Sequence, residues 1–427
     1  MKLVNLAYLP HPLGGYSFSN WKQVPFNGFP PNRGLFHFGQ FPYMIFSIHM
    51  HIISDIRNIL LTMQNMLGPK CKELEGEIKS LMKVWFSIIA SLCYCYFISS
   101  NIPKGKLRLL SLTPVLCLFT FLPLQLSYVL PTGITAFLIT WLTSFKLILF
   151  TFDLGPLSSN PPKSLPFFLS FACLPLRGIT QNQNQPYPSN QTHQNHSKVN
   201  VRKEKLHFII FPIKALLFGV LLMGLNDHKQ KIDHTVIIGL YCILVFLLVD
   251  IVVGLCNIVA NAALGIELEL PSNEPYLSTS LQEFWGRRWN LIVTYLLRHT
   301  IYIPVRTALS RTVLGPQWAS VPGVMASFVV SGIMHELLFY YVTRAAPTWE
   351  VTCFFVLHGV CVVVELCVMK WLGHKGMLHW AISGPVTVVF VVATAACLFF
   401  PPLLRDGADE RALEEFRNLV DCIKETF

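Results

Sequence analysis

SVPGVMASFVVSGIMHELLFYYVTR, residues Ser320–Arg344, has the length and composition of a helix that crosses a bilayer. Such a helix takes roughly 20 mostly apolar residues. His335 and Glu336 lie deep in this run. Because ionisable side chains are unfavourable in hydrocarbon, the pair predicts a functional site. The alternative is a histidine that bonds to a neighbouring helix for packing alone.

The whole chain has the composition of a membrane protein. Of its 427 residues, 53% are hydrophobic and 13% are charged, whereas a soluble domain has about 25% charged residues. The mean hydropathy is +0.50. The formal net charge is +10, and the Lys and Arg residues lie mostly between apolar runs. We therefore expect membrane lipids or an anionic substrate as partners, and no nucleic acid.

The length criterion identifies about nine candidate membrane helices. They are Leu81–Ser99, Leu107–Val129, Thr132–Phe152, Ser164–Leu176, Leu206–Leu225, Val236–Ala262, Ser320–Val342, Val351–Leu372 and Ala381–Phe400. Pro166 and Pro175 predict that the fourth run is broken or re-entrant. The sequence therefore predicts an all-α, polytopic integral membrane protein with about nine transmembrane helices around a buried reaction chamber.

Polar segments divide the chain. We expect Met1–Leu74 to be an N-terminal extension of unknown role, without fixed structure. Residues 75–404 are expected to form the membrane core, and residues 405–427 a C-terminal tail. Within the core, Gly178–Lys205 is rich in Asn and Gln and ends in basic residues, which predicts a disordered loop.

The basic residues predict an orientation, because cytoplasmic loops are enriched in Lys and Arg. With nine spans and a cytosolic N terminus, Gly178–Lys205 and Glu267–Arg311 face the cytosol. The glycosylation sequons that begin at Asn190 and Asn195 would then be cytosolic too. The loop Lys104–Arg108 would be lumenal, against the charge rule.

The cysteines predict no disulfide framework. Twelve are scattered along the chain, several inside apolar runs, with no CxxC pair and no metal-ligand spacing. We expect them to be small apolar side chains in lipid. Two lysines interrupt apolar runs: Lys214, near the end of a run, can extend its amine to the interface, whereas Lys146 has no such explanation.

Residues 267–344 form the expected catalytic region. Its first part, ELELPSNEPYLSTSLQEFWGRRWNLIVTYLLRHTIYIPVR, places Trp, Tyr and Phe beside Arg, which is typical of a segment at the membrane interface. Ser278 or Ser280 could cap a helix there. Ser280 and Glu283 have the spacing of a capping box, which predicts a helix that continues through Asn290.

The sequence lacks the residue spacing that defines the motifs of several other enzyme classes. A zinc metalloprotease needs His-Glu-x-x-His, but Phe339 occupies the position of the second histidine after His335. The sequence contains no GxSxG elbow, no P-loop and no dinucleotide fingerprint. We therefore expect no metal ligands and no hydrolytic serine.

FWGRRWN at Phe284–Asn290 and SGIMHELLFYY at Ser331–Tyr341 together resemble the plant wax synthase branch of the membrane-bound O-acyltransferases. ELPSNEPYLSTSLQEFWGRRWN and PTWEVTCFFVLHGVCVVVE are similar to the same branch. The resemblance covers Glu75–Leu404 and is densest over Glu267–Glu365. It implies an enzyme of the endoplasmic reticulum that esterifies a long-chain fatty alcohol with a fatty acyl group from acyl-CoA. The product would be a wax ester; a sterol acceptor, giving sterol esters, is the alternative.

The resemblance also implies catalytic residues. The membrane histidine of the family corresponds to His335, and the asparagine of its upstream motif corresponds to Asn290. A neutral imidazole can take the proton of an attacking alcohol near pH 7. Asn290 could donate to the developing oxyanion, orient His335 or bind the acyl carbonyl. No metal or organic cofactor is expected, since acyl-CoA is a co-substrate.

Four further residues are expected to bind substrate: Arg287, Arg288, Trp289 and Glu336. The two arginines either hold CoA phosphates or bind lipid phosphates at the interface. Trp289 also suits packing, and Glu336 suits packing or the orientation of His335 better than the role of an acid. His358, in the following span, is expected to be structural.

A rival interpretation comes from another class of protein. A lipid transporter could use His335 in a proton relay, which would predict inverted repeats with paired broken helices. The sequence shows no such internal repeat, and a transporter leaves the FWGRRWN motif unexplained.

Overall fold

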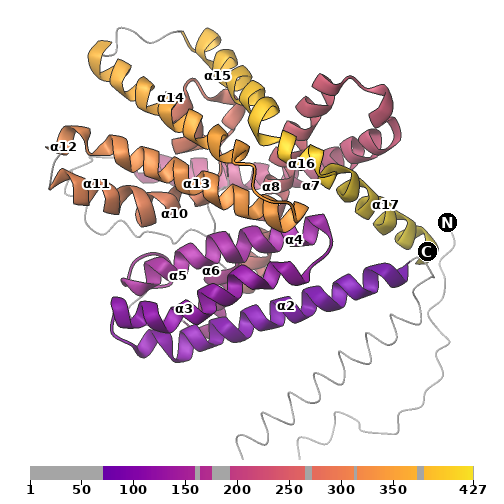
Figure 1. Cartoon of the computed structure of the whole chain (residues 1–427), viewed down its shortest axis with the longest axis horizontal. Coiled ribbons are helices and arrows are strands. Elements are labelled where there is room, and N and C mark those ends of the chain that lie inside the picture. The colour runs from indigo at the N-terminus through magenta and orange to yellow at the C-terminus, as the bar shows by residue number, and fades with distance from the viewer. Residues whose placement is uncertain are drawn as a thin grey trace, which may run out of the picture. The chain divides into compact units, whose positions relative to one another are not determined.

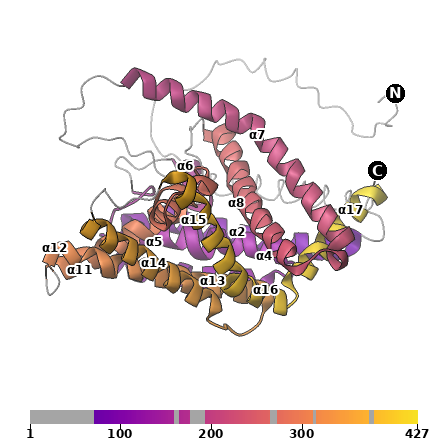
Figure 2. The same ribbon diagram turned by 90° about the horizontal axis from the view of Figure 1, so that it is seen from above.

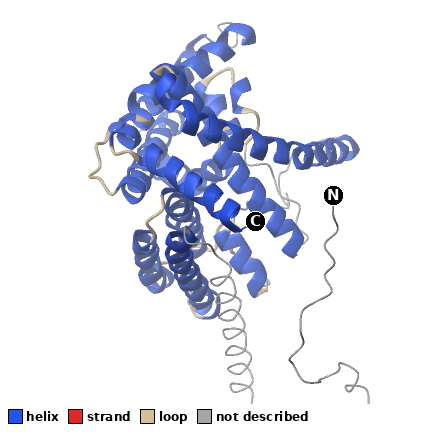
Figure 3. Cartoon of the chain, turned by 90° about the vertical axis from the view of Figure 1, so that its right-hand side faces the viewer, coloured by secondary structure: helices blue, strands red, loops and turns tan. Residues whose placement is uncertain are grey.

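The structure is a computed structural model that describes residues 71–158, 164–175, 193–264, 272–311, 315–372 and 379–426. All regular structure within these ranges is helical (Figure 3), which confirms the all-α prediction. The expected extension Met1–Leu74 lies outside the described residues up to residue 70, and its last residues already belong to the first described helix.

The first half of the core contains the longest helices, and α7 and α8 pack against each other (Figure 2). Its elements are α2 (Lys72–Phe97), η3 (Ser99–Asn101), α3 (Lys106–Phe121), η4 (Leu122–Gln125), α4 (Val129–Ala136), the π-helical η5 (Phe137–Thr143), α5 (Ser144–Thr151), α6 (Leu165–Cys173), α7 (His193–His228), η6 (Lys229–Lys231) and α8 (His234–Leu264). Residues 193–205 of the expected disordered loop therefore form the start of α7. The rest of that loop lies outside the described residues.

The second half alternates short and long helices, with α13 and α14 side by side (Figure 1). Its elements are η7 (Pro275–Leu277), α9 (Leu281–Glu283), the π-helical η8 (Phe284–Arg288), α10 (Leu291–Leu297), the π-helical η9 (Arg298–Tyr302), α11 (Ile303–Ser310), α12 (Gly315–Trp318), α13 (Ser320–Thr343), α14 (Glu350–Leu372), α15 (Trp380–Thr394), the π-helical η11 (Ala395–Phe399), α16 (Pro401–Arg405) and α17 (Ala408–Thr426).

Seven helical runs within the described residues are long and apolar enough to cross a membrane. They are Lys72–Asn101, Lys106–Gln125, Val129–Thr151, Thr235–Ala260, Ser320–Thr343, Glu350–Trp371 and Trp380–Arg405. The fourth expected span shrinks to α6, which has 9 residues. At 1.5 Å per residue, α6 is about 14 Å long and cannot cross a hydrocarbon core of about 30 Å. The expected run at Leu206–Leu225 lies in α7, which is not among the seven.

Small residues let α13 and α14 approach closely. A Cβ atom on Gly332 would lie 2.9 Å from Thr352 Cα, and one on Gly359 would lie 3.0 Å from Phe328 Cβ. Membrane helices associate through such contacts, because lipid offers no hydrophobic drive for helix pairing. Since Gly332 precedes His335 by one turn, this contact holds His335 against α14.

The two lysines in apolar runs both have partners. Lys146 is fully buried, and its amine donates to the carbonyl oxygens of Phe171 at 2.7 Å and Leu174 at 2.5 Å. Carbonyls at the end of a helix lack helical partners, so Lys146 anchors the end of α6. Lys214 forms an ion pair with Asp250 of α8 at 2.5 Å instead of extending its amine to the interface.

The expected tail, residues 405–427, contains α17, which packs on the core and which we call the strap. Asp409 accepts hydrogen bonds from Lys229 at 2.7 Å and from the Tyr241 hydroxyl at 2.6 Å. Glu415 accepts hydrogen bonds from the first two backbone amides of α4. These bonds join the strap to the α7–α8 turn and to α4, so the tail is an ordered part of the core.

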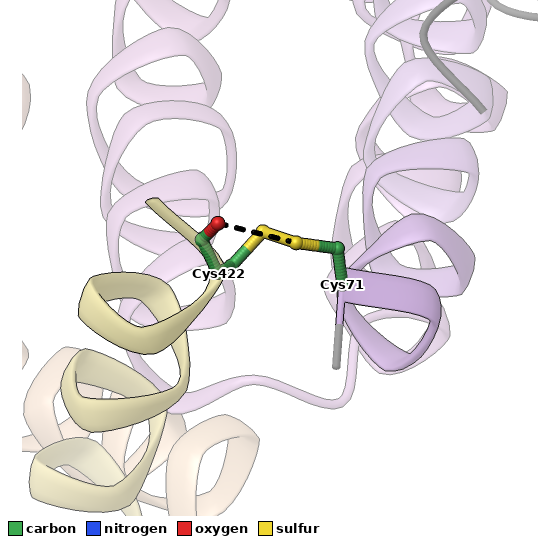
Figure 4. Close-up of a disulfide and its surroundings, with 2 residues drawn as sticks. All are labelled: Cys71 and Cys422. Atoms are coloured by element: carbon green, nitrogen blue, oxygen red, sulfur yellow. Dashed lines mark hydrogen bonds between the residues drawn. A yellow bond between two sulfur atoms is a disulfide. The ribbon is translucent and has the colours of Figure 1, made fainter. Parts of the chain in front are cut away.

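A disulfide joins the strap to the start of α2. Cys71 and Cys422 are bonded, with their Cα atoms 5.1 Å apart (Figure 4). The expectation of unpaired cysteines is wrong for this pair, since a separation of 351 positions gives no local signal of the contact. The other ten cysteines, all within the described ranges, are free.

The core has two ends, which we name the strap end and the motif end. At the strap end, the disulfide begins α2, and Arg405 pairs with Glu350 at the start of α14. We give the name motif end to residues 273–290 together with the part of α14 on which they pack, around His358 and Glu365.

Candidate active site

The orientation of the His335 ring is set by its own helix, α13. Its Nδ1 atom is 2.8 Å from the carbonyl oxygen of Ser331, one turn earlier. Because a carbonyl oxygen only accepts, Nδ1 carries the proton and Nε2 keeps its lone pair. Within the described part of the chain, no group hydrogen-bonds Nε2. The imidazole is therefore held in the tautomer that a general base needs.

Three aromatic rings contact His335. Trp141 meets it edge to face with ring centroids 4.9 Å apart, Phe355 stacks on it at 4.3 Å, and Phe399 lies at 5.6 Å. These rings come from η5, α14 and η11, and the first and last of these segments are π-helical. Single π-helical turns are frequent at functional sites. His335 thus lies in an apolar, aromatic environment built from three separate segments.

Glu336 points from α13 toward α14. Its Oε1 atom accepts a hydrogen bond from the Thr352 amide at 3.1 Å, and its side chain is buried. Amides in the first turn of a helix have no helical acceptor, so the carboxylate caps α14. This contact is a packing role, and contact between Glu336 and substrate stays a prediction.

Half of the predicted capping box is present: Ser280 Oγ accepts the Glu283 amide at 3.0 Å, whereas the Glu283 carboxylate accepts from the Thr279 amide and not from that of Ser280. The helix that follows is short. Trp289 is extended, with φ −90° and ψ 131°, and Asn290 has the left-handed values φ 37° and ψ 66°. A left-handed residue cannot continue a right-handed helix. The prediction of one helix through Asn290 is therefore wrong.

Asn290 starts α10. Asparagine tolerates the left-handed conformation better than most residues. Its Oδ1 atom accepts the Val293 amide at 3.3 Å, which caps the new helix. The side-chain NH₂ group makes no hydrogen bond to any described residue. No hydrogen bond joins Asn290 to His335 within those ranges, so its catalytic role stays a prediction.

The two arginines of the motif differ in their partners. Arg288 Nε is 2.7 Å from Glu283 Oε1, and the guanidinium also donates to two backbone carbonyl oxygens. Burial acts to raise the pKa of the Glu283 carboxyl, but hydrogen bonds and the charge of Arg288 outweigh it and hold the pKa below its usual range. Arg287 is exposed, and none of the described residues pairs with it. Arg288 therefore holds the segment, while Arg287 is available to a ligand.

Trp289 packs inside the motif segment. It stacks on Phe284 with ring centroids 5.9 Å apart and an interplanar angle of 9°. The tryptophan of the motif that comes nearer to His335 is Trp285, whose ring centroid is 5.6 Å from Phe355, the ring that stacks on the imidazole. Substrate binding by Trp289 stays a prediction.

Two polar side chains of α14 make contacts that the sequence patterns did not indicate. His358 is fully buried, and its Nδ1 accepts from Trp285 Nε1 at 3.0 Å. Glu365 accepts the first two backbone amides of α9, at 3.0 and 2.9 Å. The two side chains are two helical turns apart and share one face of α14. Their spacing along α14 is the feature of the sequence that could have identified them as partners of one segment. Both residues position the motif segment.

Comparisons with known proteins agree with these motifs. The profile of the membrane bound O-acyl transferase family matches residues 270–357. The long-chain-alcohol O-fatty-acyltransferase of Simmondsia chinensis is 44% identical over 345 residues, which are 81% of this chain and 95% of the relative. Probable long-chain-alcohol O-fatty-acyltransferase 1 of Arabidopsis thaliana is 43% identical over 353 residues, or 82% and 98%. Acyl-CoA–sterol O-acyltransferase 1 of the same plant is 40% identical over 338 residues, or 79% and 94%. The chain therefore belongs to the membrane-bound O-acyltransferase family, in the branch of the plant wax synthases, and is an acyl-transferring enzyme.

Proposed function

We propose that the protein transfers a fatty acyl group from acyl-CoA to the hydroxyl of a long-chain alcohol, which yields a wax ester and CoA. The observation that carries the proposal is the state of His335. Its Nδ1 bond to Ser331 leaves Nε2 as the basic atom, inside a wall of aromatic rings. Two of the relatives named above carry this activity in their names.

The mechanism uses His335 first as base and then as acid. Nε2 takes the alcohol proton while the alcohol oxygen attacks the thioester carbonyl carbon. The C–S bond of the tetrahedral intermediate then breaks, and the imidazolium returns the proton to the leaving CoA thiolate. Asn290 donates from its NH₂ group to the oxyanion, since its Oδ1 is already used as a cap. The scheme involves no metal or organic cofactor, because acyl-CoA brings an activated acyl group.

A small apolar pocket lies beside the site. It lies between η5 and α13 and is lined by Ala136, Phe137, Thr140, Trp141, Met334, Leu337, Leu338 and Tyr341. Long hydrocarbon chains leave water for such surroundings. We therefore expect a substrate tail to run along these apolar side chains toward Trp141 and His335.

We infer that the motif end faces the cytosol from the membrane of the endoplasmic reticulum. The charged head of acyl-CoA crosses a bilayer poorly, so it must reach the site from the compartment in which it is held. The exposed guanidinium of Arg287 suits its phosphates. Disulfides persist in oxidising compartments, and the Cys71–Cys422 bond at the opposite end supports a lumenal strap end.

The experiment that tests this function is product identification. The full chain is expressed in cells that lack neutral-lipid synthesis, purified, and supplied with acyl-CoA plus a fatty alcohol or a sterol. We expect wax esters. A sterol acceptor is the second candidate, favoured by the relative that is named as a sterol acyltransferase, and sterol ester as the main product would replace the first. No ester with either acceptor would overturn the proposal.

A further inference from the structure

His358 joins three segments of the core through two hydrogen bonds. The ring belongs to α14 and is fully buried. Its Nδ1 atom accepts from the indole N–H of Trp285 in η8 at 3.0 Å. Its Nε2 atom lies 2.9 Å from Oγ1 of Thr394, the last residue of α15. One buried imidazole therefore connects the motif segment, α14 and the junction between α15 and η11.

The direction of each hydrogen bond fixes the tautomer of His358. An indole N–H only donates, so Nδ1 of His358 carries no proton and the ring proton is on Nε2. That proton is donated to Thr394 Oγ1, whose own hydroxyl donates to the carbonyl oxygen of Phe390 at 2.7 Å. Both ring nitrogens of His358 are thus in use, whereas no described residue hydrogen-bonds Nε2 of His335. His358 is therefore a joint between segments and not a second base.

The segments that meet at His358 also supply rings that contact the imidazole of His335. Phe355 precedes His358 by about one turn of α14 and stacks on His335 with ring centroids 4.3 Å apart. Phe399 lies in η11, which begins directly after Thr394, and its centroid is 5.6 Å from that of His335. The positions of these two rings therefore depend on how α14 and η11 are held together.

Other ring contacts make this connection stiff. Trp285 packs on Phe355 with ring centroids 5.6 Å apart. Phe354 lies 4.3 Å from His358 and 5.5 Å from Phe399, again between ring centroids. Because buried side chains are close-packed and transmit strain, a shift of the His358 ring displaces the aromatic wall of the active site.

We propose that His358 is a positioning residue for acyl transfer. Its bonds to Trp285 and Thr394 fix the spacing between α14 and η11. That spacing holds Phe355 and Phe399 in the positions that orient the imidazole of His335. This inference deepens the proposed function and rests on it, since the reaction that His358 serves takes place at His335.

The first test compares Thr394→Val with Tyr241→Phe in purified full-length enzyme in lipid nanodiscs. Each change removes one hydroxyl and its hydrogen bond, to His358 in the first case and to Asp409 of the strap in the second. For Thr394→Val we expect kcat to fall by roughly 10²-fold, as for a misplacement of about 1 Å, with the KM for acyl-CoA unchanged. Both variants should have a lower melting temperature. Tyr241→Phe should keep its kcat, because its bond lies at the strap end.

Substitutions of His358 itself separate the two bonds. His358→Phe keeps a ring and loses both hydrogen bonds. His358→Asn keeps an acceptor near the position of Nδ1 for the Trp285 indole but is too short to reach Thr394. We expect kcat to fall further in His358→Phe than in His358→Asn. If His358→Asn restores none of the kcat lost in His358→Phe, the bond to Trp285 does not position the site and the inference is contradicted.

The second test measures the surroundings of His335 without turnover. Diethyl pyrocarbonate reacts with an imidazole nitrogen that has a free lone pair, and mass spectrometry of peptides gives the rate at each histidine. We expect His335 to react faster in Thr394→Val than in the wild type, because the rings that enclose the imidazole are displaced. In Tyr241→Phe, His335 should react at the wild-type rate.

The outcomes separate this inference from the proposed function. If Thr394→Val keeps the wild-type kcat and the wild-type reaction rate at His335, the role of His358 is only structural and the inference is overturned. An equal fall of kcat in Thr394→Val and Tyr241→Phe would also overturn it, because loss of stability would then explain both. If the wild-type enzyme forms no ester, the proposed function fails, and the reaction rate at His335 still tests whether His358 positions that ring.

Discussion

The strap end and the motif end of the core are built in different ways. At the strap end, a disulfide joins Cys71 to Cys422, and the carboxylates of the strap accept hydrogen bonds from lysine, tyrosine and backbone donors. At the motif end, the helix breaks at Asn290, which adopts a left-handed conformation, and Arg287 stays exposed. Side chains that are all paired within the protein stabilise its fold. A broken helix whose side-chain donors are unpaired can present those donors to a ligand. Stability and chemistry therefore occupy different parts of this protein, and variants at the two ends should affect different measurements.

The largest effect should come from His335→Ala, which removes the proposed base. Turnover should fall by roughly 10²–10⁴-fold, because the surrounding groups are aromatic rings that cannot take a proton. Ester formation by purified enzyme is the measurement, and an unchanged elution profile in detergent serves as the folding control. Near-normal turnover in a folded variant would remove His335 from the mechanism.

Asn290 offers a matched pair of substitutions. Asn290→Asp keeps an oxygen that can cap α10 but loses the NH₂ group, so turnover should fall by roughly 10²–10³-fold while the melting temperature holds. Asn290→Ala should lower turnover by the same factor, and it should also lower the stability by about 1 kcal/mol because the cap of α10 is lost. If Asn290→Asp turns over like the wild type, the oxyanion role is wrong. A rise in the KM for acyl-CoA alone would make Asn290 a binding residue.

The two motif arginines should separate binding from positioning. Arg287→Ala should raise the KM for acyl-CoA roughly tenfold with little change in kcat, as expected for loss of a charge-assisted hydrogen bond. Arg288→Ala should lower kcat and the melting temperature, because Arg288 is tied to Glu283. Glu283→Gln should lower kcat and the melting temperature, as Arg288→Ala does, and should not raise the KM as Arg287→Ala does. Identical kinetics in both arginine variants would show that the division is wrong.

A smaller effect, confined to stability, is expected at the strap end. The double substitution Cys71→Ser, Cys422→Ser should lower stability by about 2–4 kcal/mol and leave kcat unchanged. The same substitution at the free Cys93 should have no effect on either quantity. Loss of turnover at an unchanged melting temperature would show that the strap end takes part in the reaction.

The smallest expected effect is none at all. If the motif end is cytosolic, the sequons at Asn190 and Asn195 should stay unglycosylated in a eukaryotic cell, because N-glycans are added in the lumen. Treatment with an N-glycosidase should not change the mobility of the protein on a gel. A mobility shift that disappears in the double variant Asn190→Gln, Asn195→Gln would place this segment in the lumen and reverse the orientation.

Local sequence was sufficient for the fold class, and it also singles out His335 as a candidate. In lipid every backbone group must be satisfied within its own segment, so apolar runs of sufficient length predict helices without knowledge of their neighbours. His335 stands out because an ionisable residue is rare in such a run. The Ser280 cap is likewise a local pattern, and the structure confirms it, although Glu283 bonds to Thr279 and does not complete the capping box.

Contacts between distant segments had to come from the three-dimensional arrangement. Cys71 meets Cys422 and Trp285 meets His358 across 351 and 73 positions, respectively. No periodicity links such residues, so the disulfide was missed and His358 was interpreted only as structural. The difference between Arg287 and Arg288 depends on where the chain turns after η8, and the two hydrogen bonds of His358 depend on how three segments meet. Helices form from local hydrogen bonds, but the partner of each side chain is chosen by packing, which sequence patterns encode only in part.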